Sequence, residues 1–213
     1  MGAIEQVIIA AAAVLLAISL IANALDRRDA KRQRVARSMA DVNAYGGVAA
    51  MPIGRFWAVV ASAHGNPDVL TSALARMTAE QIVAFQRRFD ELHSDLFRHD
   101  LWGAAFVARD GCGDDSFDYI RAGIIGHGQA AYEMARFDPD GFFAGVVLRG
   151  EGIENERFLS AAGDAYHEVA GEELHLRHPR MRHPSEPAGE TWDESDLGDR
   201  FPLTSSAVND AVR

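Results

Sequence analysis

Cysteine and lysine are almost missing from this chain of 213 residues. Cys112 is the only cysteine, which excludes an intrachain disulfide and agrees with a reducing compartment. The chain also lacks a phosphate-cradling glycine loop, a zinc-binding signature and the serine elbow of the hydrolases. We therefore expect no cofactor, and the sequence favours a non-enzymatic protein while leaving an enzyme open.

Charge is absent from the segment between Gln6 and Leu25. The 19 residues from Val7 to Leu25 contain neither proline nor glycine. As a helix they span roughly 28 Å at about 1.5 Å per residue, close to the ~30 Å hydrocarbon core of a bilayer. We predict one transmembrane helix within residues 1–25, because a helix satisfies all its backbone groups in lipid.

A basic cluster follows this apolar segment within residues 26–52, a juxtamembrane segment and linker. Its side chains are expected to bind anionic lipid, at about 1 kcal/mol for each basic residue near the surface. They are Arg27, Arg28, Lys31, Arg32, Arg34 and Arg37. Positive flanks stay in the cytoplasm, so we predict a single-pass inner-membrane protein with its N-terminus outside and its C-terminal domain cytoplasmic.

A cleaved signal peptide is the competing interpretation of the N-terminus. Ala22-Asn23-Ala24 fits a cleavage site of the A-x-A type. A signal peptide carries its positive charge before the apolar core, whereas here that charge follows it. The order of charge and apolar core therefore favours the membrane anchor.

The rest of the chain is strongly acidic. From Ser38 to Arg213 it contains 15 basic and 28 acidic residues, a net charge of −13. Such a domain is repelled by nucleic-acid phosphates and attracts basic proteins. The sequence therefore predicts no nucleic-acid partner and indicates a basic cytoplasmic protein.

Helix signals dominate residues 53–174, and no segment has a convincing strand pattern. Asn66-Pro67 offers an N-cap followed by proline at the first helical position. Thr78 and Gln81 form a capping-box pattern before a helix whose apolar residues repeat every three or four positions. That helix is expected to expose Arg87 and Asp90 on its polar side. We predict a mainly α fold, with a compact multi-helix cytoplasmic domain after the transmembrane helix.

The character changes in residues 175–213, where Pro179, Pro184 and Pro187 cannot sit inside a helix. We expect an irregular tail that Trp192 and Phe201 pin to the domain. The residues after Leu203 are expected to be mobile.

Several motifs between Ile53 and Phe201 resemble a bacterial family of unknown function, DUF4240. They are Arg55-Phe-Trp57, Ile82-Val-Ala-Phe85, Asp100-Leu-Trp-Gly-Ala-Ala105, Gly111-Cys-Gly-Asp-Asp-Ser-Phe117, Glu186-Pro-Ala-Gly-Glu190 and Arg200-Phe-Pro202. The resemblance covers residues 53–202 and implies a helical fold but no activity. The sequence departs from the family pattern at Gly113 and Gly123, which we expect to loosen the helix after Phe117.

Three residues near these motifs are candidates for lining a ligand pocket: Asp100, Trp102 and Arg121. Core burial of Trp102, and pairing of Arg121 with Asp100 or Asp118, explain the same residues equally well. Cys112 is expected to be a packed structural thiol, because the neighbouring acids raise a thiol pKa.

The acidic segment from Asp110 to Asp118 is the second candidate. Its carboxylates suit Mg²⁺ or Ca²⁺, which prefer oxygen ligands, although the spacing does not match a calcium-binding loop. Capping of the next helix by Asp114 or Asp115 explains them better. The sequence thus favours a membrane-anchored interaction module, with a metal-assisted hydrolase as the alternative.

Overall fold

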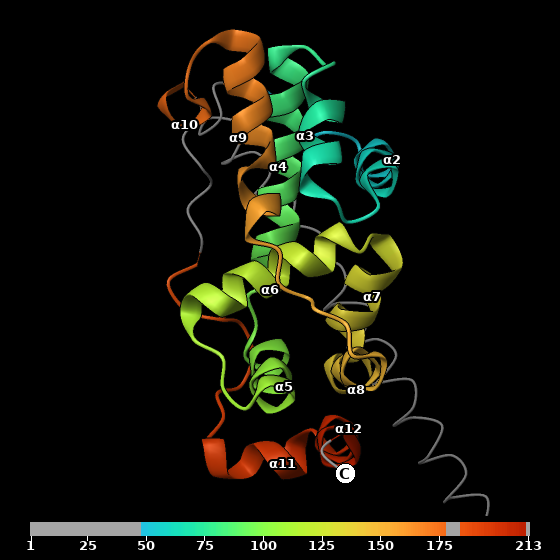
Figure 1. The fold of residues 1–213 in the computed structure, drawn as a ribbon. Coiled ribbons are helices and arrows are strands. Elements are labelled where there is room, and N and C mark those ends of the chain that lie inside the picture. The colour runs from blue at the N-terminus through green and yellow to red at the C-terminus, as the bar shows by residue number, and fades with distance from the viewer. Residues whose placement is uncertain (1–47, 178–183, 212–213) are drawn as a thin grey trace, which may run out of the picture. The chain divides into compact units, whose positions relative to one another are not determined.

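The computed structural model describes residues 48–177 and 184–211. These residues are helical apart from their connections, as predicted, and the described part contains no strand beyond one isolated parallel bridge between Arg98 and Ala188. The helices shown in Figure 1 are α2 (Ile53–Ala63), α3 (Pro67–Leu74), α4 (Ala79–Asp95), α5 (His99–Arg109), α6 (Asp114–Gly126), α7 (Gln129–Phe137), α8 (Pro139–Arg149), α9 (Glu156–Ala170), α10 (Leu174–Arg177), η1 (Glu194–Asp196), α11 (Leu197–Arg200) and α12 (Pro202–Ala211).

The first helices begin where the sequence predicts. The Asn66 side chain accepts hydrogen bonds from the amides of Asp68 (2.9 Å) and Val69 (3.3 Å) at the start of α3. Thr78 and Gln81 form both halves of the capping box that begins α4. These interactions are local in sequence and satisfy amides that have no partner within the helix, so the residue types alone predict them.

Helix α4 is buried on more sides than its apolar pattern indicates. The predicted apolar residues Ile82, Phe85 and Phe89 are buried, but so are the side chains of Arg87 and Asp90, which are 1% and 4% exposed. The expectation that these two charged residues face solvent was wrong. Nη1 of Arg87 donates to the carbonyl oxygen of Val48, and helix α9 lies against α4. The sequence pattern of α4 reveals neither contact.

The helices form two groups joined by α6. Figure 1 shows α3, α4 and α9 side by side, with α5, α8 and α12 together at the other end. Helix α6 packs against α4 and α9, and α7 continues from α6 to α8. One continuous apolar core runs through both groups, so the described helices stabilise one another.

The C-terminal segment is more ordered than expected. Residues 202–211 form α12, which packs against α8 and α5. The Asp140 carboxylate of α8 accepts hydrogen bonds from the amides of Leu203 (3.0 Å) and Thr204 (2.8 Å), the free amides at the start of α12. The prediction that residues beyond Leu203 are irregular and mobile was therefore wrong up to Ala211.

Gly123 lies inside α6 where a second backbone crosses the helix. A Cβ atom at this position would be 1.6 Å from the carbonyl oxygen of Ile153. The amide of Asn155, two residues later, donates to the carbonyl of Tyr119 in the same helix (3.0 Å). Helix α6 is continuous from Asp114 to Gly126, so the expectation that Gly123 loosens it was wrong. Glycine instead permits this close contact.

The predicted membrane anchor lies outside the described residues. No helix in residues 48–177 or 184–211 is long and apolar enough to cross a membrane. The apolar segment and the basic residues Arg27, Arg28, Lys31, Arg32, Arg34 and Arg37 all belong to residues 1–47. The transmembrane helix and its lipid contacts therefore stay predictions.

Two helix-interior glycines provide a matched test of the crossing at Gly123. Gly123→Ala is expected to lower the free energy of unfolding by about 3 kcal/mol, because a backbone carbonyl cannot move away from the new methyl group without disturbing α6. Gly163→Ala in α9 meets no atom within 4 Å and is expected to raise that free energy by about 0.5–1 kcal/mol. Urea unfolding of both variants measures this, and equal stability of the two would contradict the role of Gly123.

Candidate functional site

Trp102 is held by a ring stack and one hydrogen bond. Its ring stacks on Phe117 of α6, with centroids 4.9 Å apart and planes 12° from parallel. Its Nε1 donates to the carbonyl oxygen of Cys112 (2.8 Å), in the turn between α5 and α6. The stack and the hydrogen bond together position α5 against the start of α6.

Arg121 is buried beside the rings of Phe97 and Phe117. Its side chain is 3% exposed, and its guanidinium lies 4.8 Å from the centroid of Phe97 and 5.0 Å from that of Phe117. Nη1 donates to the backbone carbonyl of His93 (2.9 Å), and Nη2 forms an ion pair with Asp118. Burial lowers the pKa of Arg121, and the charge of Asp118 opposes that change. Of the two predicted partners, the structure selects Asp118.

His93 completes the contact between α4 and α6. Its Nε2 lies 3.1 Å from the carbonyl oxygen of Asp118, and its Nδ1 faces Nη1 of Arg121 at 3.3 Å. The ring also stacks on Phe89 of α4, with centroids 5.6 Å apart. Arg121 and His93 thus link two helices through polar contacts inside the core.

Asp100 does not join Trp102 and Arg121. It forms an ion pair with Arg98 and accepts a hydrogen bond from the amide of Leu101 (2.8 Å). Burial acts to raise the pKa of the Asp100 carboxyl, but the hydrogen bond and charge of Arg98 outweigh it, so the pKa lies below its ordinary value. The structure therefore places Trp102 and Arg121 around Phe97 and Phe117, and Asp100 in a separate ion pair.

The acids between Asp110 and Asp118 are dispersed around the start of α6. Asp110 ends α5 in a left-handed conformation (φ 54°), and Asp118 pairs with Arg121. Asp114 and Asp115 are exposed in the first turn of α6, where their charge meets the positive end of the helix dipole. The N-cap is Gly113, so the prediction that Asp114 or Asp115 caps this helix was wrong. Among the described residues, no three His, Cys, Asp or Glu side chains form a group that can hold a metal ion.

An exposed acidic segment, which we call the strap (residues 184–200), crosses α5. Its main chain is fixed by two hydrogen bonds of 2.9 Å, from the amide of His99 to the carbonyl of Ala188 and from the amide of Ala188 to the carbonyl of Phe97. Nε1 of Trp192 donates to the carbonyl of His99 (2.8 Å), and Phe201 is buried against Gly103. Both aromatic residues therefore pin this segment to the domain, as predicted.

These contacts define the protein as a helical domain. The candidate residues Trp102 and Arg121 support its fold, and the acidic strap faces solvent. The chain belongs to a family described as a protein of unknown function, DUF4240, whose model matches residues 51–168. This match confirms the resemblance up to residue 168, in the last turn of α9, and does not include the motifs between Glu186 and Pro202. Neither the curated proteins nor the solved structures contain a match to the chain.

Sequence reasoning missed two residues that the structure makes important. Asp140 follows a helix-starting proline and contacts α12 more than sixty residues away, so no local pattern indicates its partner. Gln86 is 5% exposed at the base of a pocket between α4 and α9. The one available signal is Gly163 in the middle of amphipathic α9, because an isolated helix glycine often marks a special packing position.

The reactivity of Cys112 tests the prediction that it is a packed structural thiol in the α5–α6 turn. Burial raises the pKa of its thiol to about 11, and the positive charge of Arg109 only partly opposes this. At pH 8 we expect iodoacetamide to label the folded chain roughly two orders of magnitude more slowly than the urea-unfolded chain, because the thiolate is the reactive form. As the only cysteine, Cys112 makes mass spectrometry of the intact chain sufficient. Equal labelling rates would show a reactive thiol instead.

Proposed function

We propose that this protein is a non-enzymatic interaction module that binds a basic cytoplasmic protein through its strap, while its N-terminal apolar segment tethers it to the inner membrane. The observation that carries the proposal is an acidic surface on a rigid support. The strap contains one basic residue, Arg200, and six acids: Glu186, Glu190, Asp193, Glu194, Asp196 and Asp199. All seven are exposed.

The strap is held in a defined conformation. Its backbone pairs with Phe97 in the α4–α5 connection and with His99 at the start of α5, and Glu190 forms an ion pair with Arg200 at 3.4 Å. The hydroxyl and amide of Ser195 donate to Asp193, which lowers the pKa of that carboxyl. A fixed set of charges loses little conformational freedom on binding, which favours specific recognition.

The sign of the charge supports a basic protein as partner. The net charge of −13 after Ser38 disfavours phosphate-rich partners such as nucleic acids. Association with a basic surface is accelerated at low salt and weakens as salt screens the charges over about 10 Å at 0.1 M. Salt dependence is therefore the property that separates this interaction from apolar association.

Neutral variants of the strap test the proposed interface. We expect the full chain, in a mild neutral detergent at low salt, to co-purify with one or more basic proteins that mass spectrometry identifies. A triple variant is expected to reduce their recovery at least tenfold, because it removes three exposed charges: Glu186→Gln, Glu190→Gln and Glu194→Gln. A control with the same change in charge outside the strap is expected to retain them: Glu80→Gln, Glu133→Gln and Glu168→Gln. Equal recovery with both variants would overturn the proposal.

Orientation in the membrane is tested separately. A reporter fused after Arg213 is expected to be active in the cytoplasm, because the basic residues that follow the apolar segment stay on that side. Neutralising Arg27, Arg28, Arg32 and Arg34 together is expected to reduce the cytoplasmic fraction. Activity found only in the periplasm would exclude a cytoplasmic partner.

A further inference from the structure

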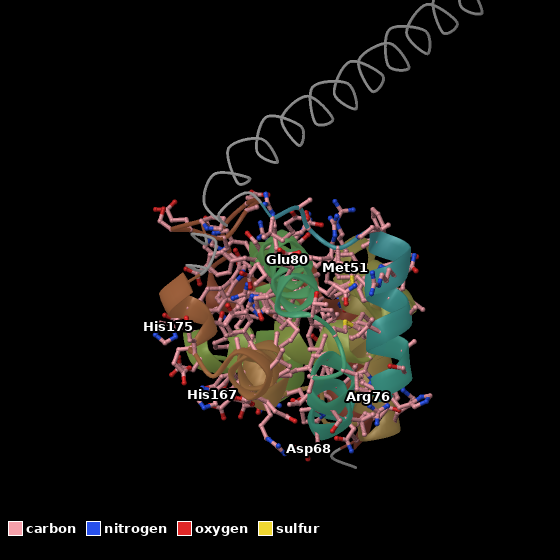
Figure 2. All side chains as sticks on the ribbon, turned by 90° about the horizontal axis from the view of Figure 1, so that it is seen from above. Met51, Asp68, Arg76, Glu80, His167 and His175 are labelled. Atoms are coloured by element: carbon pink, nitrogen blue, oxygen red, sulfur yellow. The ribbon has the colours of Figure 1, made fainter. Side chains whose placement is uncertain are left out.

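A small pocket lies between α4 and α9 and is closed on one side by the start of α10. It has a volume of about 150 Å³ and is lined by Gln86, Ser160, Gly163, Asp164, Glu173, Leu174 and His175. Figure 2 shows His175 of α10 and His167 of α9 on the same side of the domain. A cavity of this volume accepts a group about the size of benzene.

Gln86 supplies an acceptor at the base of this pocket. Its side chain is 5% exposed, and its Nε2 donates to Asp90 at 2.6 Å. Within the described residues that is the one hydrogen bond of the Gln86 side chain, so its Oε1 accepts none. The amide oxygen of this pocket-lining residue can therefore accept from a ligand that brings its own N–H groups.

The walls of the pocket add negative charge and hydrogen-bond acceptors. Asp164 and Glu173 contribute carboxylates, and Ser160 lies 3.2 Å from the Asp164 carboxylate through its hydroxyl. Glu173 also contacts His167 at 3.2 Å. The pocket lining contains no lysine or arginine.

Gly163 creates the space between these groups. It occupies a helical position in α9, and a Cβ atom there would have nothing within 4 Å. A larger residue at this position would fill the pocket without meeting the backbone. The pocket thus depends on the absence of a side chain at Gly163 in an otherwise regular helix.

We infer that this pocket binds the guanidinium group of an arginine side chain. Guanidinium has five N–H donors in one plane and no acceptor, which matches the Gln86 oxygen and two carboxylates at different points of the wall. The lining contains no lysine or arginine to oppose its single positive charge, and its one histidine is His175. This site lies between α4 and α9, away from the strap on α5, and does not depend on the proposed partner.

Isosteric probes test this inference directly. The full chain in neutral detergent is titrated with Nα-acetylarginine amide and with Nα-acetylcitrulline amide, which has nearly the same shape but no charge. We expect saturable shifts of the Gln86 side-chain amide and the Gly163 amide in NMR spectra with the arginine probe, and at least tenfold weaker binding of the citrulline probe. Equal binding of the two would overturn the inference.

Variants of the lining provide the second arm. Gly163→Leu is expected to abolish binding while the chain stays folded, and Asp164→Asn with Glu173→Gln to weaken it at least tenfold. The control pair Glu80→Gln and Asp115→Asn removes the same charge outside the pocket and is expected to leave binding unchanged. Unchanged binding in Gly163→Leu would place the ligand elsewhere and overturn the site.

Free arginine identifies the source of the guanidinium. Its carboxylate is repelled by Asp164 and Glu173, whereas the blocked amide resembles a residue within a polypeptide. Tighter binding of the blocked probe than of free arginine is the expected result and indicates a protein side chain as ligand. Tighter binding of free arginine would overturn that part of the inference. The two proposals can fail separately. The strap can lose its basic partner while the pocket still binds the arginine probe, or the pocket can lose the probe while the strap keeps its partner.

Discussion

The arrangement of α4, α5 and α6 depends on the contacts that the buried guanidinium of Arg121 makes. It contacts the rings of Phe97 and Phe117, bonds to the His93 carbonyl and pairs with Asp118. Phe117 in turn supports Trp102, which fixes α5. A buried cation is stable only when its partners are in place, because an uncompensated charge in the interior is strongly destabilising. Because the cation needs its partners in place, the interior has a specific geometry in addition to its apolar contacts.

The contacts around Arg121 also determine where the acidic strap lies. Phe97 follows the end of α4, and its carbonyl accepts the amide of Ala188 in the strap. Helix α5, held by Trp102, presents the His99 carbonyl to Trp192 and the open side of Gly103 to Phe201. The strap is therefore supported by the buried cluster without sharing its charged groups. In the proposed function, Trp102 and Arg121, which the sequence offers as candidates for lining a ligand pocket, support an interaction surface.

Local and distant contacts differ in how well the sequence predicted them. The caps at Asn66 and Thr78 act within four residues, so spacing alone predicted these helix starts. The burial of Arg87, the contact of Asp140 with α12 and the crossing at Gly123 each involve a partner that is remote in the chain. For Arg121 the sequence offered two partners, and the structure pairs it with Asp118, which lies three residues earlier in the same helix. That helical spacing is a local pattern that favours Asp118 over Asp100.

The sequence by itself determined the helical class, the starts of its capped helices, the family and the acidic balance of the chain after Ser38. These depend on residue type, short spacing and composition, which need no tertiary contacts. Only the tertiary structure decided that Asp100 pairs with Arg98 while Trp102 and Arg121 both contact Phe117, and that Gln86, Asp164 and Glu173 line one pocket. The reason is that helix packing sets which side chains from distant parts of the chain meet, and one missing methyl group, as at Gly163, sets the space between them.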